Sequence, residues 1–156
     1  MLSIVAVLLV AVVIGAATYY YVFSPVVVEG IIDHKGVTGV KDGTSYTILL
    51  NADWGIRVKD EDYEKFFSDE DRNAFINKSL EDTMKTEYSE INYLVSIRVS
   101  SEDPVNNLEK GETLAYFVSR DDFNTLRIGD EVKYEVERFQ TATIKRLLEV
   151  TPINEE

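Results

Sequence analysis

The chain has 156 residues, and its 16 basic side chains against 28 acidic ones give a formal net charge of −12. This excess of acid excludes nucleic acid as a main partner, because phosphate binding needs a surplus of Lys and Arg. The absence of cysteine excludes disulfides, thiolate metal sites and a Cys nucleophile, and a single histidine excludes any site that needs two imidazoles.

Residues 1–24 are predicted to anchor the chain in a membrane. No charged side chain occurs from Leu2 to Phe23, and a helix of this length spans roughly 33 Å, enough to cross a hydrocarbon core of about 30 Å. Tyr19 to Tyr21 fall where aromatic rings prefer the headgroup level, and Ser24-Pro25 ends the helix. A cleaved signal peptide is the alternative, with small residues at 15–17 but no basic residue before the apolar run. We expect lipid contact through Leu2 to Phe23.

The charges around this segment also predict its orientation. The first basic residue after it is Lys35, so the N-terminal amine is the nearest positive charge and favours an N-terminus on the cytoplasmic side. The lack of cysteine and the glycosylation triplet Asn77-Lys78-Ser79 are consistent with export. We therefore expect a single-pass protein of the cell membrane whose C-terminal domain is extracytoplasmic.

Residues 25–151 are predicted to form one acidic, β-rich domain, followed by a short tail at 152–156. The clearest strand is Asp130 to Arg138, where Val132, Tyr134 and Val136 alternate with charged residues and share the inward face. Similar patterns predict six further strands at Val26–Ile32, Tyr46–Leu50, Trp54–Val58, Ile91–Val99, Leu114–Val118 and Ala142–Val150.

Turn and helix signals connect these strands. Asp42-Gly43 predicts a type I′ hairpin turn, and Ile128-Gly129-Asp130 predicts a turn into the clearest strand. One amphipathic helix is predicted over Asp69 to Tyr88, with Ser68 as its N-cap. A second, short helix is predicted from Asp103-Pro104 to Lys110-Gly111.

Two segments share a further local pattern. Val58–Phe66 and Val118–Leu126 each place a valine, acidic residues, an aromatic residue and a final apolar residue in step. Each predicts the end of a strand followed by a short helical turn with acidic residues at its start. We interpret the likeness as the common chemistry of such corners, because no other segment repeats at the same offset.

The order of strands, helix and further strands predicts a mainly β, α+β fold: an antiparallel OB-like β-barrel behind an N-terminal transmembrane helix. The segment LRIGDEVKYEVERFQTATIKRLLEV, Leu126 to Val150, resembles the closing hairpin of small membrane-anchored OB-like β-barrel domains. This resemblance implies a scaffold and names no activity, since such scaffolds host many unrelated functions.

Few side chains are candidates for a catalytic or cation-binding role. The acidic stretch after Lys59 fails as an EF-hand loop, because its sixth and twelfth positions are Lys65 and Asp71, and it leaves Asp60, Asp62 and Glu64 as candidate cation ligands. His34 is predicted to lie in a turn or at the surface, since the nucleophile elbow of a Ser-His-Asp hydrolase is missing. Trp54 is predicted to lie in the core.

These features predict a non-enzymatic interaction domain at the membrane surface, whose partner is a protein or a second copy of the chain. No catalytic or cofactor-binding residue is assigned, because no phosphate-binding glycine loop is present. Two alternatives stay open: a barrel that binds a small ligand or a cation, and a carboxylate-dependent hydrolase, since 28 acidic residues guarantee some pair at a suitable separation.

Overall fold

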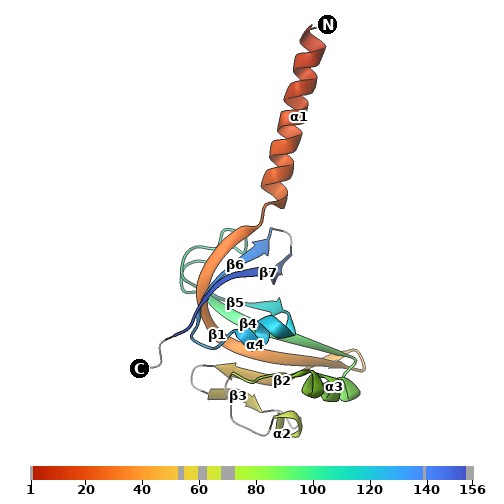
Figure 1. Ribbon diagram of the computed structural model, residues 1–156, viewed down its shortest axis with the longest axis vertical. Coiled ribbons are helices and arrows are strands. Elements are labelled where there is room, and N and C mark those ends of the chain that lie inside the picture. Colours follow the sequence, from red (N-terminus) through yellow and green to blue (C-terminus); the bar gives the residue numbers. More distant parts are fainter. Residues whose placement is uncertain (1, 53–54, 60–62, 68–72, 139, 154–156) are drawn as a thin grey trace.

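The computed structural model describes residues 2–52, 55–59, 63–67, 73–138 and 140–153, of which 2–9, 55–59, 140 and 141 are described without their side chains (Figure 1). The chain is mainly β with a few helices, which confirms the predicted α+β class. Its elements in order are α1 (Leu2–Phe23), β1 (Val26–Lys41), β2 (Thr44–Ala52), β3 (Gly55–Lys59), α2 (Tyr63–Phe66), α3 (Lys78–Glu87), β4 (Glu90–Val99), β5 (Thr113–Val118), α4 (Arg120–Thr125), β6 (Glu131–Glu137) and β7 (Gln140–Thr151).

The long strand β1 organises the sheet. One of its edges pairs with β6 over Val26–Ile31 and with β2 over His34–Lys41, and its other edge pairs with β4 over Gly30–Val40. From β4 the pairings continue through β5, β7 and β6 and so return to β1. The β5–β7 pairing is parallel, and every other pairing is antiparallel. Five strands therefore form a closed cycle of pairings.

A bulge in β1 changes which of its side chains face inward. Val28 and Ile32 are buried before the register shift between Ile32 and His34, whereas Lys35 and Val37 are buried after it. An extra residue in one strand of a pair moves the following side chains to the opposite face. The strand predicted to end at Ile32 thus continues to Lys41, with its inward face displaced by one residue.

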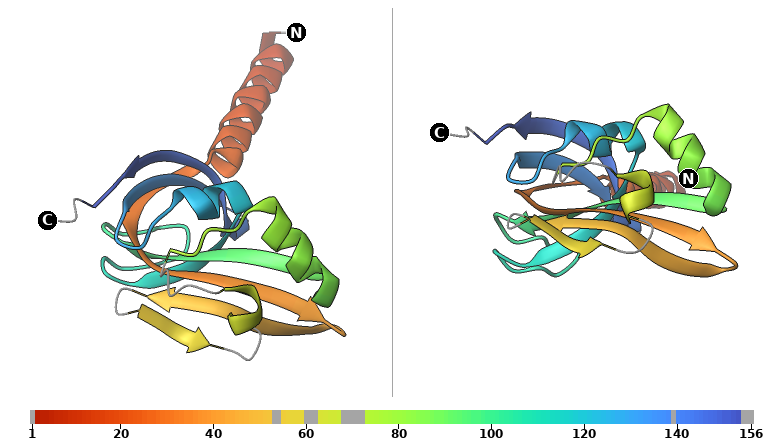
Figure 2. Two further views of the ribbon diagram at one scale, coloured as in Figure 1. Left: turned by 60° about the horizontal axis from the view of Figure 1, so that its bottom comes forward. Right: turned by 90° about the horizontal axis from the view of Figure 1, so that it is seen from below.

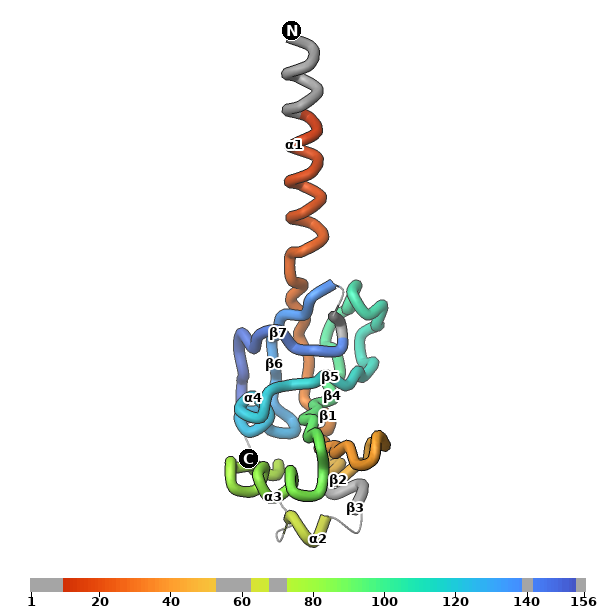
Figure 3. Tube along the Cα trace, turned by 90° about the vertical axis from the view of Figure 1, so that its right-hand side faces the viewer, coloured from red at the N-terminus to blue at the C-terminus, as the bar shows by residue number. Residues whose placement is uncertain are grey.

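The segment between β1 and β4 is an addition to the cycle. β2 pairs with β1 and β3 with β2, so β3 is the edge of the sheet, and α2 and α3 follow it. Figure 3 shows this addition at the end of the domain opposite to α1. Figure 2 shows α3 beside α4, so that the two helices lie next to each other although β4 and β5 separate them in the chain.

All seven predicted strands are present, and the alternation within them gives the core. Tyr134 is fully buried in β6 between Val132 and Val136, as predicted, while Glu131 is exposed. The Asp42-Gly43 turn is also confirmed, because both residues have positive φ, 52° and 76°. Trp54, predicted to lie in the core, is outside the described residues.

The predicted amphipathic helix is shorter than expected and is not alone. Among the described residues, helix begins at Lys78 rather than near Asp69, and α2 and α4 add two short helices. Residues 73–77 are not helical, and backbone groups of Asn73 and Ile76 bond to side chains elsewhere in the chain. The Asn124 side chain bonds both N–H and C=O of Ile76, and Asn77 Oδ1 accepts the N–H of Leu80 as the N-cap. The predicted N-cap, Ser68, lies outside the described residues.

The short helix predicted from Asp103-Pro104 is wrong, and the segment is a closed loop. Asp103 and Leu108 exchange backbone hydrogen bonds of 2.9 and 3.0 Å. The carboxylate of Asp103 accepts the N–H groups of Val105 and Asn106, and this local bonding replaces the first turn of a helix. The two segments with a shared pattern behave as predicted, because β3 leads to α2 and β5 leads to α4.

The N-terminal segment forms α1, which projects away from the sheet (Figure 1). Within the described part of the chain, no helix combines the length and the apolar character needed to cross a membrane. The span predicted for Leu2 to Phe23 stays a prediction.

Candidate functional site

The structure describes one of the three candidate cation ligands. Asp60 and Asp62 lie outside the described residues, and Glu64 is exposed on α2. Among the residues whose placement is described, no group of three or more His, Asp or Glu side chains could hold a metal ion. On the same helix, Lys65 Nζ lies 2.6 Å from Glu87 Oε1. The described residues of α2 therefore connect it to α3.

His34 lies within β1 and not in the predicted turn. Its Nδ1 is 3.2 Å from Asp33 Oδ2, and its side chain is 13% exposed. Arg98 of β4 places Nη2 at 3.6 Å from the other oxygen of Asp33. The three side chains form a small charged cluster that joins β1 to β4 beside the bulge.

Lys35 is a functional candidate that the sequence did not reveal. Its side chain is almost fully buried, and Nζ donates to the carbonyl oxygens of Asn73 at 2.6 Å and of Leu126 at 2.8 Å. The ammonium also lies 4.1 Å from the ring centroid of Phe123. Because these contacts hold α4 and the segment before α3 against β1, they use the lysine for packing. The bulge that turns Lys35 inward has no sequence signal of its own.

A second buried polar cluster surrounds Asp103. Its Oδ2 accepts Asn106 Nδ2 at 2.7 Å and the hydroxyl of Tyr116 at 3.3 Å. Burial raises the pKa of Tyr116 to about 12, and the nearby Asp103 charge acts in the same direction. Burial also raises the pKa of Tyr134, whose ring meets that of Tyr116 edge to face. Both phenols stay protonated at neutral pH, so the cluster holds the 103–108 loop against the core.

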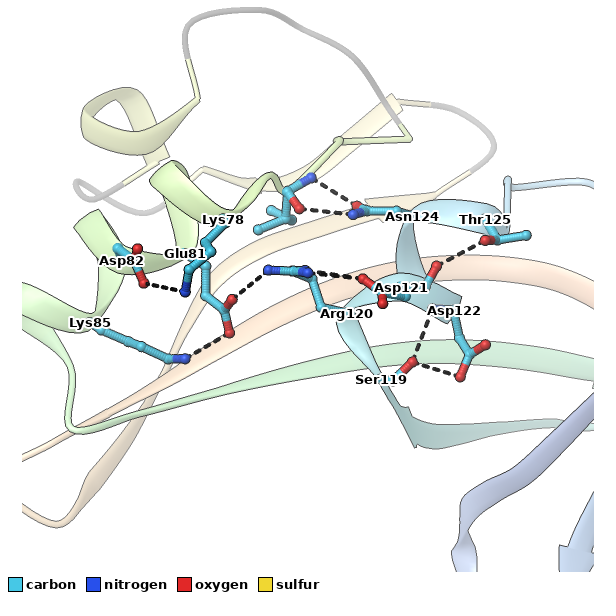
Figure 4. A network of polar contacts seen from close by, with 11 residues as sticks. Lys78, Glu81, Asp82, Lys85, Ser119, Arg120, Asp121, Asp122, Asn124 and Thr125 are labelled. Atoms are coloured by element: carbon cyan, nitrogen blue, oxygen red, sulfur yellow. Dashed lines mark hydrogen bonds and ion pairs between the residues drawn. The ribbon is translucent and has the colours of Figure 1, made fainter.

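A surface network joins α3 to α4 (Figure 4). Glu81 accepts Lys85 Nζ at 2.7 Å and Arg120 Nη1 at 2.9 Å. The hydrogen bond from Lys85, its charge and the Arg120 guanidinium hold the pKa of Glu81 below its ordinary value against the opposing effect of burial. The hydrogen bond to Asp121 raises the pKa of Arg120. Together with the Asn124–Ile76 hydrogen bonds, the network fixes the two helices side by side.

Two adjoining depressions open on the outer surface beside β6. The first, of about 310 Å³, is lined by Glu29, Gly30, Ser100, Glu131, Val132, Lys133, Glu149 and Thr151. The second, of about 390 Å³, is lined by Ile31, Arg98, Gly129, Glu131, Thr151, Pro152 and Ile153. Lys133 Nζ bonds Glu29 Oε1 at 2.6 Å, and this hydrogen bond raises the pKa of Lys133. The first depression thus carries both charges in its lining, whereas Ile31, Pro152 and Ile153 make much of the second apolar.

The exit from α1 is the remaining candidate and joins the helix to the domain. Ser24 donates from both N and Oγ to the carbonyl oxygen of Tyr20, at 2.9 and 2.6 Å, and ends the helix. The rings of Tyr19 and Phe23 are 4.7 Å apart. Arg138, in the turn between β6 and β7, places Cζ 4.7 Å from the ring centroid of Tyr21. The exit therefore combines aromatic rings with a single guanidinium.

Comparison with known proteins adds no family to this description. No protein-family model matches the chain, and neither a curated protein nor a solved structure matches it.

Proposed function

We propose that the chain is a single-pass, membrane-anchored interaction domain that acts at the membrane surface without enzymatic activity. The carrying observation is the exposed apolar surface of α1, which stands clear of every strand (Figure 1). Val12, Val13 and Ile14 are 66%, 64% and 59% exposed. Exposure of a continuous apolar surface to water is unfavourable. Lipid would shield the surface of a charge-free helix that ends in aromatic residues.

The link between α1 and β1 supports a position close to the bilayer. Only Ser24 and Pro25 separate the last helical residue from the first residue of β1. Proline fixes its own φ and restricts the residue before it, and Ser24 is held by its two hydrogen bonds to Tyr20. A link of this kind keeps the domain at the headgroup level. The sparse positive charge near the helix, as argued above, favours the extracytoplasmic side.

We also propose that the closed cycle of pairings is an OB-like barrel. The cycle β1, β4, β5, β7, β6 contains five strands, and α4 lies between β5 and β6 in the chain. A closed cycle of five strands, antiparallel except for the β5–β7 pairing, with a helix before the last two strands, matches the architecture of an OB-like barrel. β2, β3, α2 and α3 would then be an insertion between its first two strands.

The use of the buried charged groups supports a binding role over catalysis. The carboxylate of Asp103 accepts hydrogen bonds from a backbone N–H of its own loop, from an amide side chain and from a phenol. The ammonium of Lys35 donates to two backbone carbonyl groups of separate segments. Such groups stabilise the fold, because burying them without partners would be costly. A stable acidic scaffold at a membrane surface is suited to hold a protein partner or a second copy of the chain.

Membrane insertion of the full chain tests the anchor. Val12→Lys places a charge near the middle of α1, where insertion becomes less favourable by about 3 kcal/mol. We expect the variant to shift from the membrane fraction that resists alkaline extraction to the soluble fraction. Val27→Lys is the matched control, since Val27 is also an exposed valine but lies on β1. Wild-type chain released by alkali, or a Val12→Lys variant that stays inserted, would contradict the anchor.

Protease treatment of intact cells tests the side of the membrane. With an extracytoplasmic domain, added protease removes the domain without cell lysis, whereas a cytoplasmic domain is protected until the membrane is opened.

Crosslinking in native membranes tests the proposed interaction. A reproducible adduct to one protein, or to a second copy of the chain, is expected. Turnover abolished by a single Asp or Glu substitution would instead favour a carboxylate-dependent hydrolase.

A further inference from the structure

The pairing of β1 with β6 brings the β6–β7 turn to the exit from α1. Val26 is opposite Val136 in an antiparallel register. Continuing that register by two residues places Arg138 opposite Ser24, at the end of the helix. The 4.7 Å contact between the Arg138 guanidinium and the Tyr21 ring agrees with this placement. Two segments far apart in sequence thus meet where the chain leaves α1.

Arg138 differs from its cationic neighbours on the same hairpin. Lys145 Nζ lies 2.9 Å from Glu137, and Arg146 Nη2 lies 2.9 Å from Glu135. Among the described residues, Arg138 has no carboxylate partner, and its Nε is buried without a hydrogen-bond acceptor. Its guanidinium carbon lies 4.7 Å from the ring centroid of Tyr21, in a cation–π contact. The hairpin therefore carries one positive charge that has no carboxylate partner among the described residues.

The chemistry of this group selects its ligand. A guanidinium presents planar, paired N–H donors that match two oxygens of a phosphate, and it stacks on aromatic faces at the same time. Aromatic rings at the end of a membrane helix lie at the headgroup level, where lipid phosphates are concentrated. We propose that Arg138 binds the phosphate group of a membrane lipid at the exit from α1 and thereby positions the β6–β7 hairpin against the bilayer. This proposal rests on the membrane anchor proposed above.

Solid-state NMR of the full chain in bilayers measures this contact directly. The chain is labelled with ¹⁵N in its arginine guanidinium groups, and dephasing of their signals by lipid ³¹P is recorded in phosphatidylcholine vesicles. A zwitterionic lipid is chosen because it supplies phosphate without attracting or repelling the acidic domain as a whole. We expect a dephased guanidinium signal in the wild-type chain. Arg138→Gln should lose it, and the matched control Arg146→Gln should keep it.

A second bilayer separates lipid phosphate from free phosphate. Digalactosyldiacylglycerol contains no phosphorus, so inorganic phosphate is then the one source of ³¹P. No dephasing is expected in this bilayer, and dephasing equal to that in phosphatidylcholine would overturn the assignment to lipid. If Arg138→Gln fails to fold, Arg138→Lys replaces it, because lysine keeps the charge but carries no guanidinium signal.

The outcomes distinguish the two proposals. Flotation with the vesicles tests the anchor independently of Arg138. If the chain floats but no guanidinium is dephased, or if the dephased signal survives Arg138→Gln, the phosphate contact is refuted and the anchor stands. If the wild-type chain does not float, both proposals fall. A crosslink from the β6–β7 turn to a protein carboxylate, without ³¹P dephasing, would replace the lipid with a protein partner.

Discussion

Substitution of Gly30 by alanine tests the close approach of β1 to β4 within the cycle of strands. Gly30 is buried and pairs with Val99 of β4 on one side and with Val132 of β6 on the other. A Cβ atom at this position would lie 2.5 Å from Ile97 Cγ2 and 2.6 Å from the carbonyl oxygen of Arg98. Both distances are far shorter than van der Waals contact, and the oxygen belongs to the backbone of a paired strand. β1 and β4 would have to separate locally.

The expected loss of stability follows from these contacts. Overpacking of a core by a methyl group costs about 1–3 kcal/mol when side chains can move aside. Here a backbone carbonyl must also move, so we expect a loss of about 3 kcal/mol or more for Gly30→Ala. In a domain of this size each kcal/mol lowers Tm by roughly 3–5 °C. A fall in Tm of roughly 10 °C or more should result.

Gly36→Ala provides the matched control in the same strand. The nearest atom to a Cβ at Gly36 is the Leu49 carbonyl oxygen at 3.3 Å, which is tight but needs a shift of only a few tenths of an ångström. The measurement is thermal unfolding of the full chain in detergent, followed by far-ultraviolet circular dichroism. If Gly30→Ala and Gly36→Ala unfold at the same temperature, the close approach of β1 to β4 at Gly30 is wrong.

Three further predictions concern a turn, a surface carboxylate and a buried lysine. Gly43→Val should cost about 1 kcal/mol or more, because φ is +76° there, and an unchanged Tm would contradict the turn. Glu81 has a lowered pKa when folded, so its contribution to stability is complete above its ordinary pKa of about 4.5 and is lost as pH falls through the lowered value. The difference in Tm between wild type and Glu81→Gln, measured against pH, should therefore shrink as the solution is acidified. A difference that stays constant with pH would show that the ionised Glu81 carboxylate does not contribute to stability. Lys35→Met should lower stability by about 2 kcal/mol in urea unfolding, since it removes the ammonium from two carbonyl groups, and an unchanged midpoint would show that these bonds contribute little.

Strand positions could be predicted because alternation survives in most of the sheet. In β6 the buried Val132, Tyr134 and Val136 follow the sequence pattern without interruption. In β2 the pattern fails locally, because the register shift opposite Val37 and Thr38 leaves both Ile48 and Leu49 buried. A bulge depends on how two strands meet, and nothing in the local sequence of either strand specifies it.

The helix boundaries depend on hydrogen bonds to residues that lie far away in the chain. Ser68 and Asn77 are both good N-cap residues, so local chemistry could not choose between them. Asn124 bonds the backbone of Ile76, just before α3, where Asn77 is the N-cap. At Asp103-Pro104 the same residue types suit a helix start and a tight loop, and burial of the carboxylate beside Tyr116 favours the loop.

The candidate site at the exit from α1 could likewise be predicted only in part from local sequence. Tyr19 to Tyr21 were predicted to lie at the exit because their position follows from the apolar run alone. Arg138 could not be assigned to it, because its place depends on the pairing of β6 with β1 across more than half of the chain. The same pairing connects Arg138 to the rest of the sheet, since β1 is a single strand of 16 residues that runs from the exit to the hairpin with β2. A guanidinium fixed to a lipid phosphate at one end of this strand would orient the whole sheet, including β2 and β3 at its far end, relative to the membrane.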